Sequence, residues 1–205
     1  MKSTHFIIKK KPKPINNQQE FKLSLLPAYA IEYAKLNVNG QANMLETHQV
    51  QGDAIIWETG KNSYVIGDDW DVCLEIAYHG IRDHSLLFPQ ISGHNGLAKR
   101  LGEFYDEAEK SFDNKAWLSY ALMCGGIFEG LLIGSGCTKW NFDDKITEAR
   151  GKGIIDVRQE QIINSTREAR NKIHANKCND PYILRKEAFD IMATMDQLIK
   201  SFAGC

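Results

Sequence analysis

The stretch from Asn164 to Cys178 concentrates the side chains with the greatest capacity for chemistry in this chain. If it is one helix, residues three, four and seven apart share a face. Four polar side chains would then point the same way, and they define what we call the Arg/His face: Arg167, Arg170, Asn171 and His174. Guanidinium groups carry fixed positive charge that suits a phosphodiester, and an imidazole can move protons near neutral pH. This face therefore predicts a site for a nucleic-acid phosphate.

The plainer interpretation is a solvated helix face. An arginine would then pair with a glutamate, and a histidine near the C-terminal end of a helix would interact favourably with the helix dipole. A phosphate site needs a cleft or an interface around the face, whereas a solvated face needs only water. The predicted elements of the rest of the chain therefore help to choose between the two interpretations.

Composition is that of an ordinary globular protein. The chain has 205 residues, of which 43% are hydrophobic and 25% charged, enough to bury a core. Its formal net charge of -1 excludes a general polycation, so any contact with nucleic acid needs a local patch. The N-terminal residues lack a secretory apolar region, and no run approaches the ~18 to 20 apolar residues of a membrane span. We expect a cytoplasmic protein with no membrane partner.

Cysteines and acidic residues give no metal or disulfide pattern. The five cysteines are odd in number and show no C-x-x-C spacing, which favours reduced, structural cysteines. The acids that follow Gly67, including Asp68, Asp69 and Asp71, are more typical of a turn than of a metal site. We expect no metal and no other cofactor.

Residues 1–90 are predicted to form a β-rich unit with a basic arm. Strand-sized runs are separated by turn residues, among which Asn39-Gly40 is a strong hairpin signal. Residues 72–78 alternate in polarity, with Val72, Leu74, Ile76 and Tyr78 on the face expected to be buried. Residues 25–36 fit either a strand or a short helix. The arm fits a lysine-protected edge strand or a contact with nucleic acid, and it contains Lys2, Lys9, Lys10, Lys11 and Lys13.

Residues 91–205 are predicted to form an all-α helical bundle of about five helices, so the fold class is α+β. Apolar residues change here from a period of two to about three and a half. The expected helices cover residues 97–111, 115–133 with Asp113 as N-cap, 143–150, a stretch from 157 onward, and a last one that starts at Asp180-Pro181. In the last helix a regular apolar stripe should pack inward: Leu184, Ala188, Ile191, Met195, Leu198 and Phe202.

The helix over residues 115–133 is apolar nearly all round, which predicts the buried centre of the bundle. Three glycines, Gly125, Gly126 and Gly130, should permit close approach of neighbouring helices. Glu129 is the lone carboxylate there, and we expect it to partner an arginine, with a place beside the Arg/His face as the alternative.

Asp156 and Gln159 have the spacing of a capping box, so the helix that carries the Arg/His face should begin at Val157. Its inner stripe is expected to be Ile162, Thr166, Ala169 and Ile173, with Ile163 on the side of the Arg/His face. A polar site bordered by apolar surface is typical of a cleft or a subunit interface.

The order of these elements resembles the HEPN superfamily of small helical bundles. The resemblance rests on the apolar helix with F-E-G-L-L, a short amphipathic helix, a G-I-I-D turn, R-E-A-R-N-K-I-H and a closing helix, and it covers about Leu97 to Phe202. The signature of that superfamily is an arginine, four to six residues and a histidine. Arg167 and His174 have six residues between them. One departure is Glu168, whose carboxylate would oppose an anionic substrate unless it pairs elsewhere, for example with Lys172.

The resemblance implies metal-independent cleavage of RNA by a homodimer in which two copies of the motif face each other. Arg167 and His174 would be catalytic, Arg170 and Asn171 would bind substrate, and the product would carry a 2′,3′-cyclic phosphate. It also implies a toxin or an effector of antiviral defence, with an antitoxin or regulatory protein as a further partner. Two alternatives stay open: a non-catalytic HEPN module that binds RNA, nucleotide or a partner protein, and a purely structural helical dimer.

Overall fold

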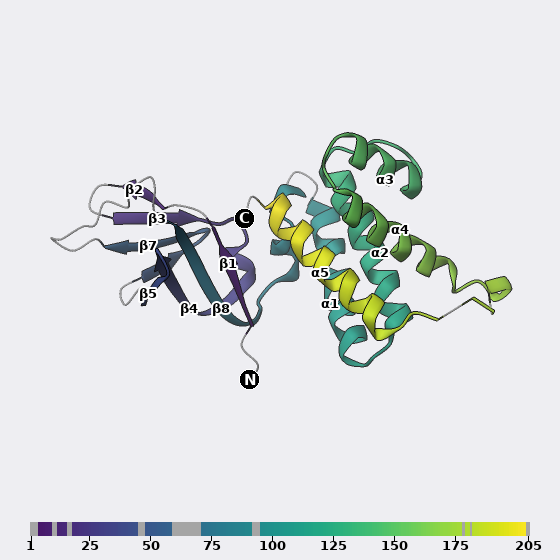
Figure 1. Ribbon diagram of the computed structural model, residues 1–205, viewed down its shortest axis with the longest axis horizontal. Coiled ribbons are helices and arrows are strands. Elements are labelled where there is room, and N and C mark those ends of the chain that lie inside the picture. The colour runs from purple at the N-terminus through teal and green to yellow at the C-terminus, as the bar shows by residue number, and fades with distance from the viewer. Residues whose placement is uncertain are drawn as a thin grey trace. The chain divides into compact units, whose positions relative to one another are not determined.

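The computed structural model describes residues 4–9, 12–15, 18–44, 48–58, 71–91, 95–177, 179–180 and 182–203. The chain splits into two compact units, Met1–Leu86 with Ala203–Cys205, and Leu87–Phe202. The first contains the strands and the second the five α-helices (Figure 1), so the predicted α+β class is confirmed. The break lies close to the boundary expected at residue 90, and the last three residues group with the first unit.

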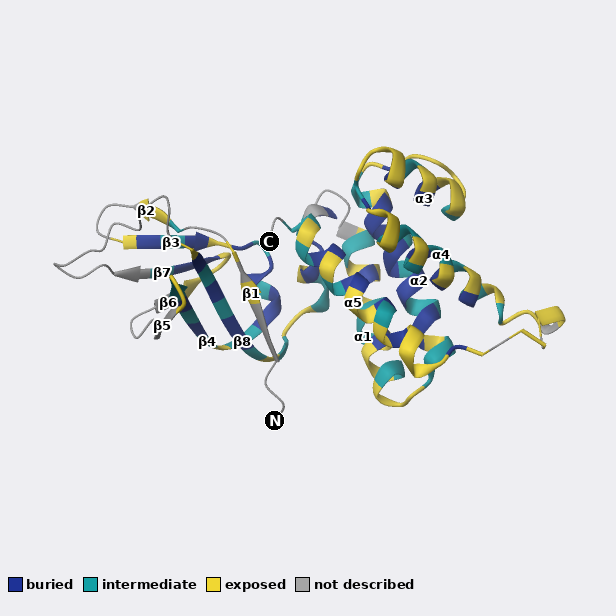
Figure 2. Ribbon diagram, in the orientation of Figure 1, coloured by how far each residue is buried: buried dark blue, intermediate teal, exposed yellow. Residues whose placement is uncertain are grey.

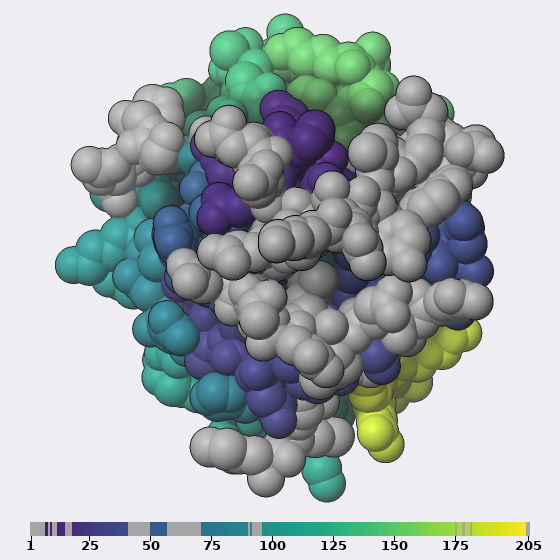
Figure 3. Space-filling model, turned by 90° about the vertical axis from the view of Figure 1, so that its left-hand side faces the viewer, coloured from purple at the N-terminus to yellow at the C-terminus, as the bar shows by residue number. Residues whose placement is uncertain are grey.

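Eight strands in the described residues form two antiparallel sheets. Figure 3 shows one face of this unit, whose described residues run from purple to teal along the chain. The first sheet has the order β1 (Thr4–Ile8), β8 (Val72–Ile81), β4 (Tyr29–Val38) and β5 (Gln41–Met44). The second has the order β2 (Lys13–Ile15), β3 (Gln18–Lys22), β7 (Ala54–Glu58) and β6 (His48–Gln51).

The hairpin predicted at Asn39-Gly40 is confirmed, since Val38 pairs with Gln41 and both turn residues have positive φ, 51° and 77°. The ambiguous stretch is mainly strand β4, preceded by a short 3-10 turn at Leu26–Ala28. Of the face predicted on β8, Val72, Leu74 and Ile76 are buried, whereas Tyr78 is only half-buried.

In the basic arm, Lys13 is exposed on β2, an edge strand, as the edge-strand interpretation expects. Lys2, Lys10 and Lys11 lie outside the described residues, as does most of the acidic turn after Gly67.

In the helical unit, α2 (Trp117–Gly134) is the central element, as its composition predicts. It contacts each of the other helices, which are α1 (Asn95–Asp113), α3 (Phe142–Gly151), α4 (Val157–Asn171) and α5 (Arg185–Phe202). Its inward residues, among them Tyr120, Phe128 and Leu131, are almost completely buried (Figure 2). By length and composition α2 could cross a membrane, but half of its apolar window is buried inside the unit, as in the core helix of a soluble protein.

The start of a helix was predicted correctly where the sequence contains a full capping box, and wrongly where it offers only a single candidate N-cap residue. At Asp156 both hydrogen bonds of the capping box form, 2.8 and 2.9 Å long, and α4 begins at Val157. Asp113 is not the N-cap of α2; it ends α1, and a turn with positive φ at Lys115 follows.

The start of α5 was also predicted wrongly. The helix begins at Arg185, where the Glu187 carboxylate accepts a hydrogen bond of 2.6 Å from the N–H of Leu184. Leu184 is 66% exposed and leaves the predicted stripe, whereas Ala188, Ile191, Met195 and Leu198 are buried as expected. Pro181 lies outside the described residues.

Glycines on α2 admit side chains of α1, which confirms the expected close approach. A Cβ atom at Gly130 would lie 2.5 Å from Leu101 Cδ2, and one at Gly126 would lie 2.8 Å from Phe104 Cε2. Leu101 is only 1% exposed, so moving it aside would disturb the packing around it. This packing sets the distance between α1 and α2.

Replacing Gly130 by alanine should therefore destabilise the helical unit. Overpacking against Leu101 outweighs the gain in helix propensity, and we expect a net loss of about 1–2 kcal/mol in the free energy of unfolding, measured by denaturant titration. The control is Gly151→Ala at the end of α3, where a Cβ atom meets nothing within 4 Å and stability should be unchanged or slightly higher. Equal stabilities of the two variants would refute this account of the packing.

Candidate functional site

The Arg/His face is not one helical face, because α4 ends at Asn171. Beyond it the N–H groups of Ile173 and His174 bond to carbonyls three residues back, at 3.5 and 3.2 Å. Such turns are tighter than an α-helix, so His174 is rotated away from the position that a continuous helix would give it. The prediction that one continuous helix carries all four side chains is therefore wrong beyond Asn171. The side chains of His174 and Asn171 are both exposed.

Only some of the residues predicted to form the buried stripe of α4 are buried in the structure. Thr166 and Ala169 are buried as predicted, and Thr166 Oγ1 donates a hydrogen bond of 2.8 Å to the carbonyl of Ile162. Ile163, expected beside the Arg/His face, is completely buried and Ile162 only half-buried. Ile173 is 55% exposed, because it follows the end of the helix.

Arg167 reaches the first turn of α3. Its Nη2 atom lies 3.1 Å from Asp143 Oδ1, and its Nε donates to Asn164 Oδ1 over 3.3 Å. The Asp143 side chain is 62% exposed. An ion pair so open to water typically contributes less than about 1 kcal/mol. A phosphate could therefore replace Asp143 at small cost, and Asn164 would keep the guanidinium oriented.

Arg170 reaches both α2 and α3. Its Nη1 atom lies 3.5 Å from Glu129 Oε2, and its guanidinium carbon lies 5.9 Å from the centre of the Phe142 ring. The stem of the side chain crosses Gly125, where a Cβ atom would lie 2.6 Å from Arg170 Cδ. Both arginines therefore converge on the start of α3, and the role expected for Glu129 as the partner of an arginine is confirmed.

Glu129 also holds Lys145 of α3. The lysine Nζ lies 3.2 Å from Glu129 Oε1 and donates to the carbonyl of Trp140 at 2.7 Å, while its side chain is only 8% exposed. Glu129, Lys145 and Arg170 form what we call the Glu129 cluster. With one carboxylate against two cations, the cluster carries a positive charge.

The loop between α2 and α3 is fixed from its other side by Glu148. This carboxylate accepts hydrogen bonds from the N–H groups of Thr138 and Lys139, at 2.9 and 3.1 Å, and lies 2.7 Å from Lys152 Nζ. The hydrogen bond from Lys152, followed by that from Lys139, lowers the pKa of Glu148 to about 2. The loop so held presents Trp140, which is 91% exposed, three residues before Asp143.

A hollow of about 440 Å³ lies beside Arg170. Its walls are mainly apolar side chains of α1 and α2, and not the α4 stripe from which the sequence predicts an apolar border. It is lined by Leu97, Arg100, Leu101, Phe104, Leu122, Met123, Gly126, Glu129, Gly130, Ile133 and Arg170.

Other reactive groups do not join this site. Burial raises the pKa of the Cys124 thiol to about 12, which keeps it neutral, and burial also raises the pKa of Cys137. Glu168 is exposed, and within the described part of the chain it forms no ion pair with Lys172. The described residues include no group of three or more His, Cys, Asp or Glu side chains that could hold a metal ion.

Sequence reasoning identified the arginines but missed what they contact. Asp143, Phe142 and Lys145 lie in a helix that was predicted, yet no local pattern pairs them with residues more than fifteen positions away in α2 or α4. Trp140 carried one usable signal, since a tryptophan flanked by lysine and asparagine in a loop is a candidate for exposure.

Comparison with known proteins reaches only the helical part of the chain. Residues 106–203 match the model of a family described as a domain of unknown function, DUF4145. The match includes Arg167, Arg170, Asn171 and His174. No curated protein and no solved structure matches the chain.

Replacing Glu148 by glutamine should loosen the Trp140 loop in a pH-dependent way. The pKa of Glu148 is about 2 in the folded protein against an ordinary value of 4.5, so its stabilising effect is complete above pH 4.5 and fades toward pH 2. We expect faster hydrogen exchange at the Thr138 and Lys139 amides of Glu148→Gln than of the wild type at pH 6, with the difference shrinking as the pH falls from 4.5 toward 2. Glu168→Gln is the control and should show no such difference at any pH. A difference for Glu148→Gln that is as large at pH 2 as at pH 6 would contradict the assignment.

Proposed function

We propose that the helical unit is a metal-independent endoribonuclease of the HEPN type, acting through Arg167 and His174. The observation that supports this best is the convergence of two arginines on the start of α3, from a helix that ends three residues before the exposed His174. Arginine binds phosphate oxygens in a bidentate manner, and an exposed imidazole can exchange protons with a substrate. Trp140 adds an exposed aromatic ring on which an unpaired base could stack.

In the proposed reaction His174 accepts the proton of a ribose 2′-hydroxyl. The 2′-oxygen then forms a bond to phosphorus while the bond from phosphorus to the 5′-oxygen breaks. A second imidazole, or His174 after protonation, gives the leaving 5′-oxygen its proton. The products are a 2′,3′-cyclic phosphate and a 5′-hydroxyl, so atoms and charge balance with no redox change.

Arg167 is proposed to exchange Asp143 for the scissile phosphate and to stabilise the charge that grows in the transition state. Arg170, held by Glu129, and the exposed Asn171 would position the neighbouring phosphate or sugar. Because His174 lies beyond the end of α4, we propose that the complete site needs the motif of a second copy, as a homodimer. The exposed Ile173 beside it would be covered there.

The biological setting is proposed from the HEPN resemblance alone. It is a cytoplasmic toxin or antiviral defence effector that an antitoxin or regulatory protein keeps in check.

The alternative is a non-catalytic module that binds RNA through the same face. It is favoured by one specific observation: in the described structure each arginine already pairs with a carboxylate, Asp143 or Glu129. Arginines that are already held by carboxylates are better suited to binding an RNA phosphate than to stabilising the charge of a transition state.

The two functions are separated by His174→Ala and Arg167→Ala, assayed on single-stranded RNA in EDTA. For the enzyme we expect each variant to lose cleavage by a factor of about 10² to 10⁴, because proton transfer and charge stabilisation are removed. Arg158→Ala is the matched control, since Arg158 is exposed on the first turn of the same helix, far along it from the motif.

Circular dichroism should be unchanged in all three variants. RNA binding without any product, reduced in Arg167→Ala and unchanged in His174→Ala, would establish the binding module instead. Cleavage that EDTA abolishes, or that His174→Ala retains, would refute the catalytic assignment.

A further inference from the structure

The β-rich unit contains a pocket of about 330 Å³ that is independent of the Arg/His face. Its walls come from segments far apart in the chain, namely the 3-10 turn at Leu26–Ala28, β4, the β6–β7 turn at Gly52 and the end of β8. A concave site with walls from several segments is the usual form of a small-molecule site.

Apolar side chains form part of the pocket wall. Of the side chains that line it, Leu26 and Tyr29 are buried, Ile31 is half-buried and Val50 is exposed. Val50 is 44% exposed, which is unusual for a valine and follows from its place on the edge strand β6. A ligand body that covered Val50 and Ile31 would remove apolar surface from water.

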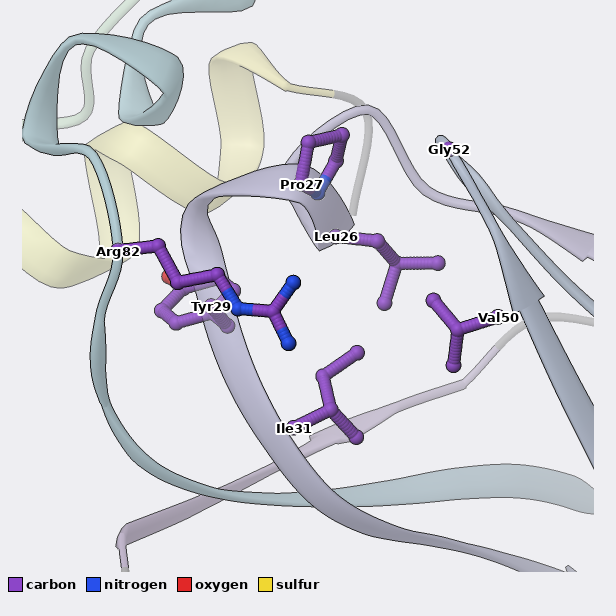
Figure 4. Close-up of a pocket in the computed structure, with 7 residues that line it drawn as sticks. All are labelled: Leu26, Pro27, Tyr29, Ile31, Val50, Gly52 and Arg82. Atoms are coloured by element: carbon purple, nitrogen blue, oxygen red, sulfur yellow. The ribbon is translucent and has the colours of Figure 1, made fainter.

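One charged group points into this apolar space. Figure 4 shows the Arg82 side chain crossing the Tyr29 ring, with its guanidinium directed between Leu26, Ile31 and Val50. The backbone of Arg82 is anchored, since its N–H donates to the carbonyl of Ala28 at 2.7 Å. The guanidinium is therefore aimed by a fixed stretch of chain.

The acid next in sequence does not neutralise Arg82. Asp83 accepts hydrogen bonds from the backbone N–H and the hydroxyl of Ser85, at 2.8 and 2.6 Å, and these bonds lower its pKa. Within the described residues the Arg82 guanidinium has no ion pair. Its five donors are thus available to a ligand.

We propose that this pocket binds a small carboxylate with an apolar body, its carboxylate on Arg82 and its body against Leu26, Ile31 and Val50. A guanidinium matches a carboxylate in a bidentate manner. Among the described residues that line the pocket, Arg82 is the only cation, which suits one negative charge better than a phosphate dianion. The volume suits a body of about ten heavy atoms, at the lower end of ligand pockets.

Octanoate is a suitable probe, with octanamide as its uncharged analogue of the same shape. Titration calorimetry of the full-length chain should show octanoate binding at least tenfold more tightly than octanamide. In Arg82→Met, which keeps a long apolar side chain, this preference should disappear while octanamide binding stays the same. Lys35→Met, at a cation of β4 outside the pocket, should keep the preference.

A second variant guards against a folding defect. Val50→Asp at the exposed edge should bind neither probe yet melt at the wild-type temperature, since Val50 is not part of the core. Equal affinity for the two probes, a preference that survives in Arg82→Met, or no binding of octanoate below its micelle concentration would each overturn the proposal. None of these outcomes depends on RNA cleavage by the helical unit.

Discussion

The helical unit depends on the Glu129 carboxylate, placed on the most apolar helix of the chain. A carboxylate in such surroundings needs opposite charge and hydrogen bonds. It receives them from Lys145 of α3 and Arg170 of α4, so one side chain joins three helices. Lys145 is nearly buried and would be left without its counter-charge if Glu129 were absent. The position of Arg170, and through Lys145 the position of the Trp140 loop, follow from this requirement.

Packing of α2 supplies the second constraint. Gly126 and Gly130 bring α1 close, while Gly125 gives the stem of Arg170 a path across the helix. Glycines of one short stretch of α2 thus permit the packing of α1 on one side and the passage of the Arg170 side chain on the other. An arginine confined between Gly125, Phe142 and Glu129 loses less freedom when it binds a ligand than one that is free in water.

Local signals explain which features the sequence predicts. The capping box at Asp156 depends on only four consecutive residues, and the turn at Asn39-Gly40 on only two. Both were therefore predicted correctly from the sequence. The end of α4 was missed because R-N-K-I-H contains no glycine or proline to mark it. Pairing of Arg167 with Asp143 and of Arg170 with Glu129 joins residues far apart in sequence, and it depends on how whole helices pack.

The proposed nucleophile is the ribose 2′-hydroxyl, so an RNA that lacks this group at the cleaved position is the decisive substrate. A short single-stranded RNA that the protein cuts at one position would be compared with the same RNA carrying a single 2′-deoxyribose on the 5′ side of that position. We expect the altered RNA to be bound equally well but left intact at that position, because the nucleophile is missing. Cleavage of the altered bond at the normal rate would contradict it.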